Sequence, residues 1–138
     1  MTNSEKIVYS IFGVTNKSTQ DMAYAVDRMA ELLFDQNQKL DGIKVGKAIY
    51  PVVAERAERP VGGVSRNIQR LTRACWDAEN RKNLLPFLGR DMPIRVPKEL
   101  LFHLAYYSRT GIPYIKAMKH HAAPPVLDGR GCRRGKEG

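Results

Sequence analysis

The sequence predicts an all-α fold, a compact bundle of five to six helices that contains a helix-turn-helix. Apolar residues recur at intervals of three and four along most of the chain, which places them on one face of a helix. No segment shows the period-two alternation of a half-buried strand. The 138 residues correspond to one ordinary domain, and 43% of them are hydrophobic, so a single core can form.

The N-terminal part contains two expected helices. The first covers residues 4–12 and ends at Gly13. The second begins with Ser18 as its N-cap, because Asp21 follows three residues later, where a capping-box acid belongs. Residues 37–42 then indicate a loop. The inward face of the second helix consists of four residues at steps of four, three and four: Met22, Val26, Met29 and Leu33.

The middle of the chain predicts a helix, a turn and a longer helix. The helical pattern covers residues 43–57, and Pro51 inside it predicts a kink or a break because proline lacks a backbone donor. Residues 59–63, Arg-Pro-Val-Gly-Gly, have the composition of a turn. The next helix covers about residues 63–76. Its expected inward residues are Val64, Ile68, Leu71 and Cys75.

The C-terminal part predicts two further helices and a tail. A short helix covers residues 80–88, and Pro97 suits the first turn of a final core helix that ends at Gly111. Residues 113–121 are expected to add a turn or two of helix. Residues 122–138 are rich in glycine and proline and have little to bury, so we expect a disordered basic tail after a helical domain of residues 1–121.

The charge of the chain is positive and unevenly distributed. Lys and Arg number 23 against 14 Asp and Glu, a formal net charge of +9. Residues 1–43 have four basic and six acidic side chains, whereas residues 44–138 have nineteen and eight. This imbalance favours a polyanionic partner, nucleic acid first and a membrane surface second. No apolar run could span a bilayer, no signal peptide is recognisable, and Cys75 and Cys132 form no disulfide framework, so we expect a cytoplasmic protein.

Residues 51–77 have the spacing of a helix-turn-helix. Ala54 is small enough to let two helices cross closely, and Val64 and Ile68 attach the second helix to the core. At 100° per residue, the outer face of that helix consists of three arginines and a glutamine, with Ser65 at its edge. A solvated basic surface is the alternative interpretation. Arginine can contact guanine and glutamine can contact adenine, so the helix suits a DNA major groove.

Seven residues are the candidate DNA contacts, and double-stranded DNA is the predicted partner. Base-edge contacts are assigned to Ser65, Arg66, Gln69 and Arg70. Phosphate contacts are assigned to Lys47, Arg59 and Arg73, and the basic residues between Arg130 and Lys136 could add non-specific affinity. The predicted function is sequence-specific transcriptional regulation.

Two short motifs resemble a known family. The family is that of the stage-zero sporulation protein A, whose members are sporulation-initiation response regulators with a C-terminal DNA-binding domain. That domain has a Leu-Tyr-Pro-x-Ile-Ala stretch, which is similar to Ile49-Tyr50-Pro51-Val52-Val53-Ala54 in this chain. Its recognition helix ends in Ala-Trp, which is similar to Arg73-Ala74-Cys75-Trp76. Phe12-Gly13-Val14 and residues 97–105 are similar to the first and closing helices of that domain. The similarity covers roughly residues 4–109.

The resemblance implies a compact helical domain that binds tandem promoter sites as a head-to-tail pair. We therefore expect a homodimer on DNA, with residues 100–107 or the segment after them at the contact, and we expect no receiver domain in this chain. Ser65 and Gln69 replace an acid and an arginine of the family, whereas Arg66 is retained. Gly62-Gly63 replaces Ser-Arg at the start of the recognition helix. These departures alter the expected target sequence more than the expected DNA binding.

Nothing in the sequence predicts an enzyme, a cofactor, a metal site or a small-molecule substrate. His120 and His121 are adjacent and would point about 100° apart on a helix, which is a poor metal pair. Cys75 is expected to be a small core residue and not a nucleophile, because the pattern places no His partner beside it. His103 lies in the last core helix and is expected to be a packed or a surface residue. Two other functions stay open. One is a receiver-less interaction module that pairs with a full-length regulator and antagonises it, and the other is RNA or anionic-surface binding through the tail.

Overall fold

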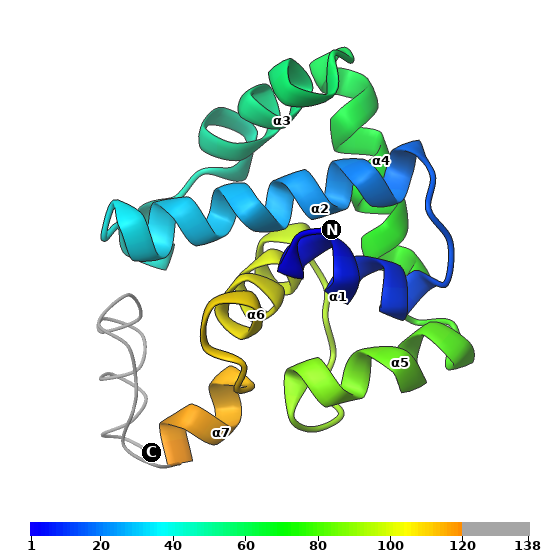
Figure 1. The fold of residues 1–138 in the computed structure, drawn as a ribbon, viewed down its shortest axis with the longest axis vertical. Coiled ribbons are helices and arrows are strands. Elements are labelled where there is room, and N and C mark those ends of the chain that lie inside the picture. The colour runs from blue at the N-terminus through cyan, green and yellow to red at the C-terminus, as the bar shows by residue number, and fades with distance from the viewer. Residues whose placement is uncertain (120–138) are drawn as a thin grey trace.

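The computed structural model describes residues 1–119, and this part of the chain is helical without strands, which confirms the all-α prediction (Figure 1). The predicted disordered tail and the His120–His121 pair lie outside the described residues. The described part has seven α-helices, the last of which is the short segment expected near residue 113. None of them has the length and apolar character needed to cross a membrane.

The elements follow one another with short connections. In chain order they are α1 (Asn3–Phe12), α2 (Lys17–Ala30), a π-helical turn η1 (Glu31–Asp35), a 3₁₀ turn η2 (Leu40–Gly42), a second π-helical turn η3 (Val45–Ile49), α3 (Tyr50–Ala57), α4 (Val61–Ala74), α5 (Ala78–Leu88), α6 (Pro97–Thr110) and α7 (Tyr114–Lys119).

Helix α2 is the centre of the fold. In Figure 1 it crosses the middle of the molecule, with α3 on one side and α1 and α6 on the other, while α4 crosses it near its N-terminal end. Small residues make this possible, because Ala23, Ala25 and Ala30 are buried and let neighbouring helices approach closely. Their larger buried neighbours, Met22 and Met29, fill the spaces that remain. The predicted inward face of this helix is therefore confirmed.

The start of α2 differs from the prediction. Asn16, not Ser18, is the N-cap: the Thr19 amide donates to Asn16 Oδ1 at 3.0 Å, and the Asn16 amide donates to Thr19 Oγ1 at 2.9 Å. This reciprocal pair satisfies two backbone donors and begins the helix at Lys17. Asp21 is consequently not needed at the cap, and its side chain lies in the interior of the molecule.

The kink or break expected at Pro51 takes the form of a change of helix type, with no gap between the two helical segments. The π-helical turn η3 ends at Ile49, and α3 begins at Tyr50 with Pro51 in its first turn, where the missing amide costs no helical hydrogen bond. Helix α3 ends at Ala57, and its C-cap residue Glu58 has a left-handed backbone with φ of 57°. The turn to α4 therefore occupies residues 58–60, and the predicted turn of residues 59–63 is placed too late.

Helix α4 begins two residues earlier than predicted. Pro60 has an extended backbone and accepts from the amides of Gly63 and Val64 at 3.1 Å each, so both glycines belong to the first helical turn. Val64, Ile68 and Cys75 are fully buried, as predicted. Leu71 is only half-buried. Thr72 is buried instead, and its hydroxyl donates to the carbonyl of Ile68 at 2.8 Å, which removes the cost of burying a polar group.

Two titratable groups of the core are held neutral. Burial raises the pKa of the Cys75 thiol to about 12, so this cysteine is a packing residue, as predicted. On α6, burial lowers the pKa of His103 from 6.5 to about 4, and nearby Glu99 only partly offsets this. The His103 Nδ1 atom is buried and has no hydrogen-bond partner, which is compatible with a neutral imidazole.

The free energy of unfolding should fall as the pH is lowered from 6.5 to about 4, because His103 has different pKa values in the unfolded and folded chain. An unfolded chain binds a proton at the ordinary His pKa of 6.5, whereas the folded chain binds it only near pH 4. Stability is therefore lost progressively below pH 6.5, by at most about 3 kcal/mol at pH 4. Urea denaturation at pH 7.0, 5.5 and 4.5 measures this loss.

The matched comparison is His103→Leu, which removes the titrating group and leaves every carboxylate in place. We expect its unfolding free energy to vary less between pH 7.0 and 4.5 than that of the wild type. Equal pH dependence in wild type and His103→Leu would contradict the assignment.

Candidate nucleic-acid interface

The outward side of α4 carries five of the predicted DNA contacts on one surface, which we call the α4 face. Arg66, Gln69, Arg70 and Arg73 are exposed, and Ser65 at its edge is half-buried. The burial of Val64 and Ile68 on the opposite side fixes this orientation. No acidic residue occurs on α4, and the nearest ones along the chain are Glu58 before it and Asp77 after it. The α4 face is therefore a concentrated basic surface on a rigid element.

The N-terminal end of the α4 face has no side-chain cap. Pro60 is the N-cap residue, its side chain cannot accept a hydrogen bond, and the first turn contains no acid. The Arg66 guanidinium lies over this turn, because a Cβ atom placed on Gly62 would be 3.6 Å from Arg66 Nη1. The positive end of the helix dipole and the Arg66 charge therefore lie close together.

Gln69 and Ser65 are one helical turn apart on the α4 face and contact one another. Gln69 Nε2 donates to Ser65 Oγ at 3.3 Å. This long, exposed hydrogen bond aligns the amide of Gln69 along the helix, and Gln69 Oε1 accepts no hydrogen bond from residues 1–119. The amide can thus present its acceptor outward, as adenine recognition requires.

A buried carboxylate attaches α4 and the turn before it to α2. Asp21 on α2 is fully buried and accepts from Arg59 Nε at 3.1 Å and from Arg59 Nη2, while Asn67 Nδ2 donates to Asp21 Oδ2 at 2.9 Å. Arg59 Nη2 also donates to the carbonyl of Lys17 at 3.1 Å. These contacts join α2, the 58–60 turn and α4, so they set the crossing of the two helices.

Arg59 therefore has a different position from the one expected of a phosphate contact. Its side chain is only 18% exposed, and its guanidinium faces Asp21 instead of the solvent beside α4. A charge buried as completely as that of Asp21 needs a partner of opposite sign, and Arg59 supplies it. The sequence contained one indication of this pair, because Asp21 is directly beside Met22, which was predicted to face inward. It was missed because Asp21 was interpreted as part of a helix cap.

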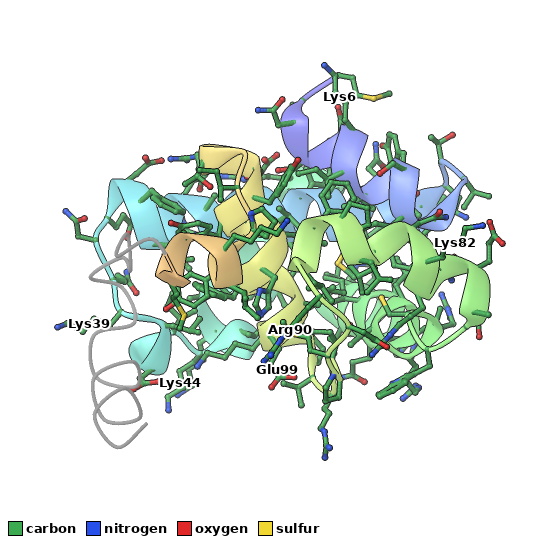
Figure 2. All side chains as sticks on the ribbon, turned by 90° about the horizontal axis from the view of Figure 1, so that it is seen from below. Lys6, Lys39, Lys44, Lys82, Arg90 and Glu99 are labelled. Carbon is green, nitrogen blue, oxygen red and sulfur yellow. The ribbon has the colours of Figure 1, made fainter. Side chains whose placement is uncertain are left out.

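Lys47, the other predicted phosphate contact outside α4, lies on a different element. It belongs to η3, which packs against α3 and α2, and its side chain is exposed. Further basic residues are scattered: Figure 2 shows Lys6, Lys44 and Lys82 directed outward at separate edges of the molecule. Positive charge is thus spread over the surface, and what distinguishes the α4 face is the spacing of three arginines on one helix.

The single tryptophan of the chain lies directly after α4. Trp76 is 53% exposed, and the Cζ atom of Arg81 lies 4.8 Å from its ring centroid. Arg81 is held in turn by Asp91, whose Oδ1 accepts from Arg81 Nε at 2.8 Å. The indole is therefore covered on one side by Arg81 and partly open to solvent just after the C-terminal end of α4.

No protein-family model matches the chain, and neither does any curated protein or solved structure. The resemblance to sporulation response regulators stays a prediction. Within residues 1–119, no group of three or more His, Cys, Asp or Glu side chains is arranged to hold a metal ion.

Removing Arg59 should destabilise the fold much more than removing its neighbour Arg56. Arg59→Ala leaves the buried Asp21 carboxylate with Asn67 as its remaining side-chain donor, and breaking a buried pair in this way costs about 3 kcal/mol or more. Urea unfolding followed by circular dichroism at pH 7 measures the loss.

Arg56→Ala is the matched control, because Arg56 pairs with Glu31 at 3.1 Å on the surface, where the two side chains are 37% and 32% exposed. Such pairs contribute about 0–1 kcal/mol. Similar losses from both substitutions would show that the Asp21 contacts do not have the structural role assigned to them.

Proposed function

We propose that this chain is a sequence-specific duplex DNA-binding protein that regulates transcription, with α3 and α4 as a helix-turn-helix and α4 in the major groove. The observation that carries the proposal is the α4 face. It combines three arginines, a glutamine and a serine with no acid, on a helix whose other side is fixed in the core. A solvated basic surface is the alternative interpretation of the same residues.

The packing of α3 and α4 supports this assignment. The two helices contact each other across the 58–60 turn, and Ala54 on α3 is buried and small. In DNA-binding proteins of this type the second helix enters the major groove and its N-terminal residues contact base edges. In α4 these positions hold Ser65 and Arg66, followed by Gln69 one turn later.

The chemistry of these residues divides into two roles. Arg66 can make a bidentate contact with guanine, and Gln69 can do so with adenine, so both can distinguish base pairs. Arg73 and Lys47 are suited to phosphate contact, and the uncapped first turn of α4 offers backbone amides to a phosphate oxygen. By resemblance to the sporulation regulators, we propose that two copies bind adjacent half-sites.

Arg66→Ala and Lys47→Ala should affect DNA binding differently. Duplexes selected from a random pool by the wild-type chain supply a preferred motif, and a scrambled duplex serves for comparison. Arg66→Ala should weaken binding to the motif by about 1–3 kcal/mol and relax the preference, whereas Lys47→Ala should weaken both duplexes equally and lower the salt dependence. Quenching of Trp76 fluorescence during titration measures the affinities.

Deletion of residues 122–138 is the control for binding through the tail, and it should leave the preference for the motif intact. Equal, sequence-independent losses from Arg66→Ala and Lys47→Ala would contradict base recognition by α4. Failure of the wild-type chain to bind duplex DNA, together with tight binding to another regulator, would replace the proposal by the interaction-module function.

A further inference from the structure

Arg70 differs from the other two arginines of the α4 face because the protein already holds it. Arg70 Nη2 donates to Asn67 Oδ1 at 2.6 Å and to Ser18 Oγ at 3.2 Å. Within residues 1–119, the side chains of Arg66 and Arg73 make no hydrogen bond or ion pair. Hydrogen bonds to neighbouring side chains therefore fix the orientation of the Arg70 guanidinium. The orientations of the Arg66 and Arg73 guanidinium groups depend only on their own side-chain torsion angles.

The buried carboxylate determines which way Asn67 faces. A carboxylate only accepts hydrogen bonds, so the Asn67 atom that lies 2.9 Å from Asp21 Oδ2 has to be the amide nitrogen, Nδ2. The amide oxygen, Oδ1, consequently points the opposite way, toward Arg70. A chain of three side chains thus connects the interior of the protein, at Asp21, with the α4 face.

These contacts restrict what Arg70 can do. A guanidinium has five N–H groups, and the two on Nη2 are occupied by Asn67 and Ser18. A bidentate contact with guanine requires two parallel donors, either Nη1 with Nη2 or Nε with Nη2. Both pairs include Nη2. Arg70 in its held position therefore keeps three N–H groups, two on Nη1 and one on Nε, and these do not form a parallel pair. Single contacts of this kind suit a phosphate oxygen better than a base edge.

We propose that Asn67 is a positioning residue that directs Arg70 to a DNA phosphate, so that Arg66 and not Arg70 reads the bases. This inference rests on the proposed function and changes one sequence-based assignment, which placed Arg70 among the base contacts. Asn67 itself touches no DNA in this arrangement and acts through Arg70.

A double-mutant cycle tests the proposal with the selected motif duplex and its scrambled counterpart. The variants are Asn67→Ala, Arg70→Ala and the two combined, with folding checked by circular dichroism. We expect Arg70→Ala to weaken binding to both duplexes by a similar factor, about tenfold. Asn67→Ala should cause a large part of the same loss, and the combined variant should bind no more weakly than Arg70→Ala alone.

The matched control cycle pairs Asn67→Ala with Arg73→Ala. Arg73 lies on the same face, but within residues 1–119 its side chain makes no hydrogen bond or ion pair with Asn67, so the two losses should multiply. If Asn67→Ala lowers the folded fraction, Ser18→Ala takes its place in both cycles, because it removes the other acceptor of Arg70 Nη2 and leaves Asp21 untouched.

A second readout does not depend on DNA. In the wild-type chain the hindered guanidinium of Arg70 should give two separate Nη signals by NMR at low temperature, and these should merge in Asn67→Ala. Merged signals in the wild type would overturn the positioning of Arg70 by Asn67.

The affinity results separate the inference from the function on which it rests. A loss from Arg70→Ala that is confined to the motif duplex, or losses from Asn67→Ala and Arg70→Ala that multiply, would overturn the inference and leave the proposed function standing. Absence of any binding to duplex DNA by the wild-type chain would overturn both.

Discussion

Asp21 lies in the interior with both of its carboxylate oxygens engaged, one mainly by Arg59 and the other by Asn67. An unpaired charge at such a depth is very unfavourable, so the turn that supplies Arg59 and the helix that supplies Asn67 have to stay where they are. The apolar contacts of Val64 and Ile68 hold α4 against the core, but such contacts are non-directional. The hydrogen bonds of Asp21 are directional, so they fix the orientation of α4 relative to α2.

The same interaction organises the charges at the surface. Arg59 is withdrawn from solvent, whereas Arg66, Arg70 and Arg73 stay exposed on one side of α4. Surface pairs such as that of Arg109 with Asp35 lie on other elements and join η1 to α6. The positive charge of the α4 face is therefore not neutralised by neighbouring acids, and the formal charge of the chain alone does not describe where that positive potential lies.

Much of the architecture was predictable because it follows from local rules. The apolar intervals, the change of helix type before Pro51, the proline in the first turn of α6 and the stop at Gly111 all depend on residues near one another in sequence. The outward residues of α4 were predictable for the same reason. The role of Arg59 was not, because its partner Asp21 is 38 positions away and was equally suited to a helix cap. The N-cap at Asn16 was missed because two overlapping capping patterns compete, and only the geometry distinguishes them.

The first turn of α4 combines two glycines with an N-cap residue that lacks a capping side chain. Each glycine disfavours the helical state by about 1 kcal/mol relative to alanine, so this turn is the weakest part of an otherwise well-anchored helix. Opening of this turn would leave in place the buried residues of the helix, which begin at Val64. An anion at that end would favour the closed form, and its apparent affinity would then include the free energy of ordering one helical turn.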